Sequence, residues 1–171
     1  MKHRSYTMPG GSDPILNRSL TPYRRRALTE GLSDGLPIGL GYLAVSFAFG
    51  IYAANGGMTP LTAAFLSVTN LTSAGQFAGT SLIFRQAPWL EIGLTVLLVN
   101  IRYMLMSLSL SQKLRPGTGV LKRLLISYGV TDEIYAVAIS KPGDIGAAYM
   151  TGLMALPVAV WTIGTLLGAA A

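Results

Sequence analysis

Two adjacent carboxylates interrupt an otherwise apolar stretch, Leu124-Leu125-Ile126-Ser127-Tyr128-Gly129-Val130-Thr131-Asp132-Glu133-Ile134-Tyr135-Ala136-Val137-Ala138-Ile139. If this stretch crosses a membrane, Asp132 and Glu133 lie near mid-depth. An ionised group there costs roughly 2.5–3.5 kcal/mol and needs a partner or a water-filled cavity. If the protein is soluble, the same stretch is a surface helix with its carboxylates in water. The composition of the rest of the chain decides between these two interpretations.

The composition is that of a membrane protein. Of the 171 residues, 51% are hydrophobic and 12% are charged, whereas soluble domains average about 25% charged residues. The mean hydropathy is +0.49. The length suffices for about five or six crossings of ~20 residues each, and the 20 glycines suit close packing of helices in lipid. We therefore expect an all-α, polytopic membrane helix bundle with about five hydrophobic segments.

Several classes of function are excluded by the residues that are absent. The chain has no cysteine, and its one histidine, His3, lies in a polar N-terminal tail. Thiol chemistry, histidine catalysis and most zinc sites are therefore ruled out, and we expect no cofactor or metal. Six of the 13 Lys and Arg residues precede Gly35 and four more crowd into the loop 111–123. Clusters that flank apolar runs indicate cytoplasmic loops rather than nucleic-acid binding.

The chain divides into a polar, basic N-terminal tail, residues 1–33, and a transmembrane domain, residues 34–171. We expect the tail to be cytoplasmic because its cations precede the first apolar run. The domain contains five hydrophobic segments, at residues 35–54, 59–84, 88–110, 124–140 and 145–170. We expect 124–140 to be a short span centred on Asp132, and Trp161 in the last segment to be an interface anchor.

The segment 59–84 is uncharged but polar in its middle, which reads Ser67-Val68-Thr69-Asn70-Leu71-Thr72-Ser73-Ala74-Gly75-Gln76. This pattern fits a broken or re-entrant span that lines a polar path. It also fits an ordinary helix whose Ser and Thr side chains bond to the preceding turn. The charge pattern favours the first, because a cytoplasmic N-terminus and a cytoplasmic loop 111–123 require an even number of crossings between them.

Three segments place polar side chains near the expected midplane. An Arg with amide and hydroxyl groups can bind the carboxylate of a zwitterion, and Asp or Glu can bind an ammonium group or carry a proton. An apolar wall for an aliphatic side chain could come from Phe47, Phe77, Met104 and Met106. Two simpler alternatives stay open. The Arg and a carboxylate could form an ion pair that only fixes helix packing, or the side chain of Arg102 could extend to the lipid headgroups. The candidates for substrate binding are Asn70, Ser73, Gln76, Asn100 and Arg102, and those for proton coupling are Asp132 and Glu133.

Adjacent residues on a helix point about 100° apart, so Asp132 and Glu133 cannot both face one cavity. We expect Asp132 to face Arg102 and the segment around Asn70, and Glu133 to pair elsewhere.

Four short signatures, taken together, resemble those of the AzlC family of bacterial branched-chain amino-acid permeases and exporters. The resemblance covers about residues 30–170. It departs from the family at Ala44, where Pro is common, and at Tyr103, where His is common. The signatures are Pro37-Ile38-Gly39-Leu40-Gly41-Tyr42 with Phe49-Gly50, Ala74-Gly75-Gln76-Phe77, Asn100-Ile101-Arg102 and Thr131-Asp132-Glu133.

The resemblance implies a multi-pass protein of the bacterial inner membrane that exports branched-chain amino acids without an ATPase domain. It also implies coupling to the proton gradient and a small membrane partner of the AzlD type. Because the family is usually longer and this chain ends directly out of an apolar run, we expect that a C-terminal part of the family domain is missing. The alternative function is a truncated or non-transporting membrane subunit with a structural role. An intramembrane hydrolase is disfavoured because no membrane-embedded His or Lys could act as a base for Ser73 or Ser107.

Overall fold

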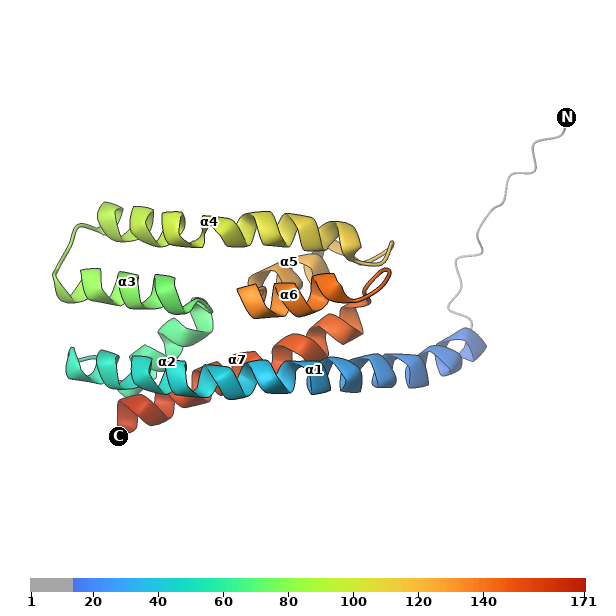
Figure 1. Ribbon diagram of the computed structural model, residues 1–171, viewed down its shortest axis with the longest axis horizontal. Helices are drawn as coiled ribbons and strands as arrows, with labels where there is room; N and C mark the ends of the chain where they lie inside the picture. The colour runs from blue at the N-terminus through green and yellow to red at the C-terminus, as the bar shows by residue number, and fades with distance from the viewer. Residues whose placement is uncertain (1–13) are drawn as a thin grey trace, which may run out of the picture.

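The computed structural model describes residues 14–171, and every regular element in this part of the chain is a helix (Figure 1). The all-α class is therefore confirmed. Residues 1–13 of the expected tail, including His3, lie outside the described residues. The helices are α1 (Pro14–Asn55), α2 (Pro60–Thr69), α3 (Ser73–Phe84), α4 (Trp89–Lys113), α5 (Val120–Tyr128), α6 (Asp132–Ser140) and α7 (Ala147–Ala170).

Three of these helices are long and apolar enough to cross a membrane. They are α1 from Pro22 to Asn55, α4 and α7, with 34, 25 and 24 residues, whereas a crossing needs about 20. The other two hydrophobic segments, 59–84 and 124–140, are each divided into two short helices. The expectation of about five segments is thus met only in part, because only three of the five are single long helices.

The segment 59–84 is a helical hairpin that enters and leaves at the same end of the molecule (Figure 1). Its break spans residues 70–72, where Thr72 is the N-cap of α3 and its Oγ1 accepts a hydrogen bond from the backbone N–H of Gly75 at 3.1 Å. The ring of Phe84 at the end of α3 lies 5.6 Å from that of Tyr52, close to where α2 begins. The prediction of a broken segment is confirmed.

The segment 124–140 forms a second hairpin, so the prediction of a single short span is wrong. The chain breaks at residues 129–131, and Thr131 becomes the N-cap of α6. At the far end of the hairpin, the guanidinium of Arg123 donates to the carbonyl of Ser111 at 2.7 Å, and Lys113 donates to the carbonyl of Ile139. Both ends of this hairpin therefore lie beside the end of α4, opposite the end at which the first hairpin enters (Figure 1).

The N-terminal half of α1 and the basic loop 111–123 lie at the same end of the molecule. The guanidinium of Arg115 contacts the hydroxyl and the ring of Tyr23. This arrangement is the one that the charge pattern required. Helix α1 also continues through residue 33, so the structure has no break at the boundary expected between tail and transmembrane domain.

Helices α1 and α7 lie side by side along most of their length, with glycines where their backbones meet (Figure 1). A Cβ atom added to Gly35 would lie 2.6 Å from the carbonyl oxygen of Leu153, which is closer than real Cβ contacts. Small residues at such crossings let helices approach closely in lipid, where packing rather than hydrophobicity drives association. Glycines of this kind are Gly31, Gly35 and Gly50 on α1 and Gly152, Gly164 and Gly168 on α7.

Candidate functional site

The N-termini of α3 and α6 lie in the middle of the molecule, beside the middle of α4 (Figure 1). Both helices begin at a threonine N-cap because each hairpin must reverse direction inside the bundle, where backbone N–H groups need partners. A cavity of about 160 Å³ lies at this junction. Its lining comes from the break in the first hairpin, from α4, and from the end of α5: Thr69, Asn70, Leu71, Thr72, Asn100, Tyr103, Ser127, Tyr128 and Val130.

An amide pair forms the polar side of this cavity. The hydroxyl of Thr72 donates to Oδ1 of Asn100 at 2.9 Å, and the amide nitrogen of Asn100 donates to Oδ1 of Asn70 at 3.5 Å. Gly75 leaves the room for this arrangement, because a Cβ atom there would lie 2.7 Å from the Asn100 amide nitrogen. Two of the predicted binding residues, Asn70 and Asn100, are therefore brought together from α4 and from the break that precedes α3.

Arg102 and Asp132 form an ion pair with 2.8 Å between guanidinium nitrogen and carboxylate oxygen. Tyr103 lies between this pair and the cavity, since its hydroxyl accepts from Arg102 and donates to Asp132, both at 3.3 Å. The pairing expected of Asp132 is present. Arg102 and Asp132 do not line the cavity themselves, so Tyr103 connects them to it.

Glu133 points away from Arg102 and toward α1. Its carboxylate accepts a hydrogen bond from the hydroxyl of Tyr42, and the Tyr42 oxygen in turn lies 2.6 Å from the hydroxyl of Thr131, from which it can accept a hydrogen bond. The ring of Tyr42 packs edge-on against Trp161 of α7 at 5.2 Å. The two adjacent carboxylates thus have different partners, as their angular separation on a helix requires. Sequence reasoning missed Tyr42 as a site residue, because its partners lie about 90 residues away.

The remaining two predicted binding residues lie away from the cavity. Ser73 is exposed. Gln76 is 2% exposed and faces α2 and α7, where its amide donates to Ser67 at 2.6 Å and accepts from the Trp161 indole at 3.0 Å. The expectation that Trp161 is an interface anchor is wrong, because its N–H has this buried partner and its side chain is 3% exposed.

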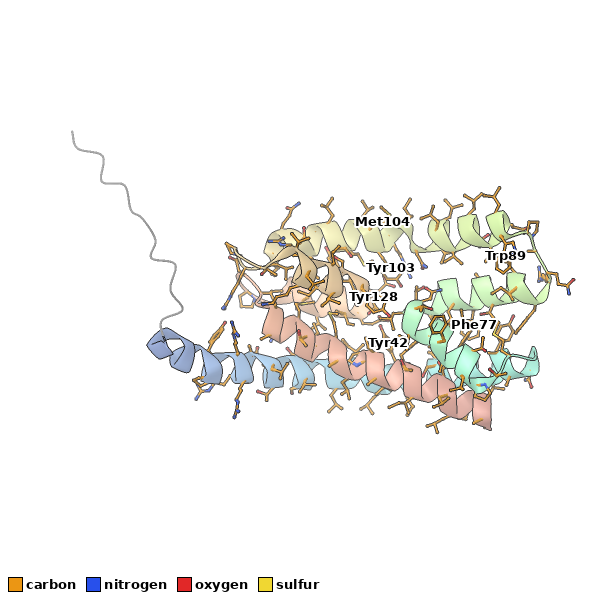
Figure 2. All side chains as sticks on the ribbon, turned by 180° about the vertical axis from the view of Figure 1, so that it is seen from behind. Tyr42, Phe77, Trp89, Tyr103, Met104 and Tyr128 are labelled. Atoms are coloured by element: carbon orange, nitrogen blue, oxygen red, sulfur yellow. The ribbon has the colours of Figure 1, made fainter. Side chains whose placement is uncertain are left out.

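The expected apolar wall is also not assembled. Met104 is 64% exposed on the outer face of α4, whereas Tyr103, Tyr128 and Tyr42 lie on the inner side (Figure 2). Phe47 is 37% exposed, Phe77 packs on neighbouring aromatic rings, and Met106 packs against the core. The apolar lining of the cavity comes instead from Leu71, Tyr103, Tyr128 and Val130.

A second charged cluster lies at the basic end and ties α1 to the loop after α6. The amine of Lys141 binds Glu30 at 2.6 Å and Asp34 at 2.9 Å. The hydrogen bond that the amine donates to Asp34, and then the one it donates to Glu30, raises the pKa of Lys141 well above its ordinary value. The two ion pairs hold this amine against α1. Among residues 14–171, no three His, Asp or Glu side chains come together to hold a metal ion.

The geometry can be compared with known proteins. The model of the family described as AzlC protein matches residues 37–171, from the second half of α1 to the end of α7. The chain belongs to the AzlC family. This result confirms the resemblance and agrees with the long apolar helices. The AzlC match includes both hairpins and thus all of the cavity lining.

Relatives of this AzlC protein are named as membrane proteins. Inner membrane protein YgaZ of Escherichia coli (strain K12) is 31% identical over 82% of this chain and 59% of its own length. Uncharacterized membrane proteins of Archaeoglobus fulgidus and Helicobacter pylori (strain J99) are 31% and 27% identical over 81% and 84% of this chain. The chain spans about three fifths of the length of these relatives. No solved structure matches it.

Proposed function

We propose that this chain is the carrier subunit of a secondary transporter that exports branched-chain amino acids across the bacterial inner membrane, with its N-terminus in the cytoplasm. One observation carries the proposal. Two helical hairpins enter from opposite ends of the molecule and meet at a small cavity lined by Asn70, Asn100 and Tyr103. Broken helices that meet in the middle of a bundle are a recurrent way of building carrier sites.

The size and lining of the cavity suit a small amino acid. At roughly 30 Å³ for each water molecule, about 160 Å³ holds about five waters, which is the scale of a small metabolite rather than a peptide. The backbone N–H groups at the start of α3 suit a carboxylate, and the amide oxygens of Asn70 and Asn100 suit an ammonium group. Leu71 and Val130 offer apolar contact to an aliphatic side chain.

The hairpins also suit alternating access. Because the two hairpins reach the cavity from opposite ends of the molecule, movement of one hairpin would change access from its own end. The long helices α1 and α7 pack closely along their length and can act as the fixed part. A site reached alternately from two sides is what a carrier needs.

Asp132 and Glu133 are the proposed proton-coupling residues. Asp132 reaches the cavity through the hydroxyl of Tyr103, while Glu133 is bonded to Tyr42 on α1. Protonation of Asp132 removes the charge that holds Arg102 at 2.8 Å. A proton can therefore loosen the contact between α4 and α6 in one step of the transport cycle.

A small membrane protein of the AzlD type is the proposed partner. The outer face of α4 is apolar and exposed, with Leu98 66%, Met104 64% and Leu105 69% exposed. A helix with such a face needs lipid or another apolar helix against it. The partner itself is proposed from the family resemblance.

The test is efflux of valine and isoleucine from cells fed the corresponding dipeptides, with and without an AzlD-like partner. We expect faster efflux from cells that express the chain than from empty cells. Equal efflux in both, with the chain in the membrane, would refute the carrier proposal and leave a structural role. Replacing Asp132 by Asn and Glu133 by Gln in separate variants assigns the proton step. Normal export and normal pH dependence by both variants would contradict the proton role.

A further inference from the structure

A groove lies between α5 and α7 at the basic end of the molecule, and it shares only Tyr128 with the lining of the central cavity. Its volume is about 700 Å³, more than four times that of the cavity. Its walls are largely apolar, with Leu125 and Ile126 from α5 and Met154 and Val158 from α7. From Ala147 to Val158 the wall of α7 covers about 16 Å at 1.5 Å per residue. The groove therefore extends along α7 for a distance comparable to much of an acyl chain.

One end of this groove is strongly basic. Arg24 of α1, Arg115 of the loop after α4, and Lys122 of α5 all line it, and no Asp or Glu is among the lining residues that the structure describes. Three other cations near this end have different partners. Arg123 donates to backbone carbonyls, as does Lys113, whereas Lys141 binds the two carboxylates of α1.

Two helices also begin at this basic end without a side-chain cap. The N-cap residues of α5 and α7 are Gly119 and Gly146, and neither can supply a capping oxygen from a side chain. Helix N-termini carry partial positive charge, so Lys122 in the first turn of α5 adds a like charge at an unfavourable place. A bound anion would relieve this repulsion and accept hydrogen bonds from the exposed backbone N–H groups.

We propose that this groove binds one anionic phospholipid, with its phosphate at Arg24, Arg115 and Lys122 and an acyl chain between α5 and α7. The combination of a basic end with an apolar channel matches a molecule that is anionic at one end and apolar along its length. Basic pockets between membrane helices at the cytoplasmic side commonly hold such headgroups. Tyr128 lines both the groove and the central cavity, so an acyl chain here touches a residue of the proposed transport site.

The test measures binding of dioleoylphosphatidylglycerol and of the zwitterionic dioleoylphosphatidylcholine to the purified full chain by native mass spectrometry. We expect the anionic lipid to bind at least tenfold more tightly. The triple variant Arg24→Gln, Arg115→Gln, Lys122→Gln should lose this preference. The matched control Arg25→Gln, Arg26→Gln, Arg85→Gln removes the same charge from residues outside the groove lining and should keep it. Equal loss in both triple variants would overturn the proposal, because surface charge alone would then explain the preference.

A second pair of variants tests the apolar channel with every cation in place. Ala155→Trp fills the groove, whereas Ala159→Trp lies on the same helix outside the groove lining. We expect only the first to weaken binding of dioleoylphosphatidylglycerol. Inorganic phosphate at millimolar concentration should not displace the lipid. Displacement of the lipid by phosphate would overturn the proposal in favour of a simple phosphate site. Unchanged lipid binding by Ala155→Trp would also overturn it, because the groove would then be left to an apolar partner helix.

Discussion

Replacement of Gly75 by Ala tests whether the amide pair of the central cavity binds substrate. The added Cβ atom would lie 2.7 Å from the amide nitrogen of Asn100 and 2.8 Å from its oxygen, whereas ordinary contact begins at 3.4 Å. The amide must therefore withdraw by about 0.7 Å or rotate. The hydrogen bond from Thr72, now 2.9 Å, and that to Asn70, now 3.5 Å, cannot both survive such a movement.

A displaced Asn100 amide also loses its alignment with a bound substrate. Loss of one neutral hydrogen bond to the substrate costs about 1 kcal/mol, which corresponds to an affinity about fivefold lower. We expect the apparent KM for valine efflux to rise by about this factor in Gly75→Ala. The fold should persist, because the atoms displaced belong to the end of one side chain and not to the backbone.

The matched control is Gly93→Ala. Gly93 lies on α4, like Asn100, and a Cβ atom there meets nothing within 4 Å. Efflux by this variant should equal that of the parent chain, and Asn100→Ala should reduce the apparent affinity at least as much as Gly75→Ala. An unchanged KM in both Gly75→Ala and Asn100→Ala would refute the assignment of the cavity as the substrate site.

Three further predictions concern the surroundings of the cavity. Tyr42→Phe removes the hydroxyl that binds Glu133 but keeps the ring on Trp161, so efflux should fall about fivefold while the Tm changes little; unchanged efflux would contradict a role for this contact. Gly50→Ala should lower the free energy of unfolding in detergent by about 1–3 kcal/mol, because its Cβ atom would overlap the backbone of α7. The control is Gly41→Ala, which should be neutral or stabilising because an added Cβ atom there meets nothing within 4 Å. Equal Tm values for Gly50→Ala and Gly41→Ala would refute the close packing of α1 on α7. Gln76→Leu leaves a buried indole N–H without its acceptor and should destabilise the fold by about 1–3 kcal/mol. A Tm equal to that of the parent would show that this network does not stabilise the bundle.

Part of the fold could be predicted because composition and charge distribution are properties of whole segments and do not depend on how individual side chains pack. Low charge content indicated the membrane bundle, and the two basic clusters required an even number of crossings, which predicted the first hairpin. The second hairpin also has a local sequence signal. Gly129 ends one helix, and Thr131 followed by two acidic residues is a typical helix start. The continuous apolar pattern on both sides led to the wrong expectation of one span.

The site was predictable only where partners could be matched by charge and depth. Arg102 and Asp132 pair as expected because two opposite charges at similar depth in a bundle stabilise each other. The direction in which Gln76 points could not be predicted, because its partners Ser67 and Trp161 come from α2 and α7 and the packing of those helices decides it. The same holds for Tyr42, whose partners lie on α6.

The two hairpins have an electrical consequence for the proposed carrier. Each consists of helices of nine to twelve residues, so at 1.5 Å per residue each covers about half of a 30 Å hydrocarbon core. A proton that moves between Asp132 and one side of the membrane therefore crosses about half of the membrane voltage. Moving one charge across the whole voltage is worth about 2.3 kcal/mol per 100 mV, so this step is worth roughly half as much. Proton-linked export should thus respond to membrane voltage as well as to pH.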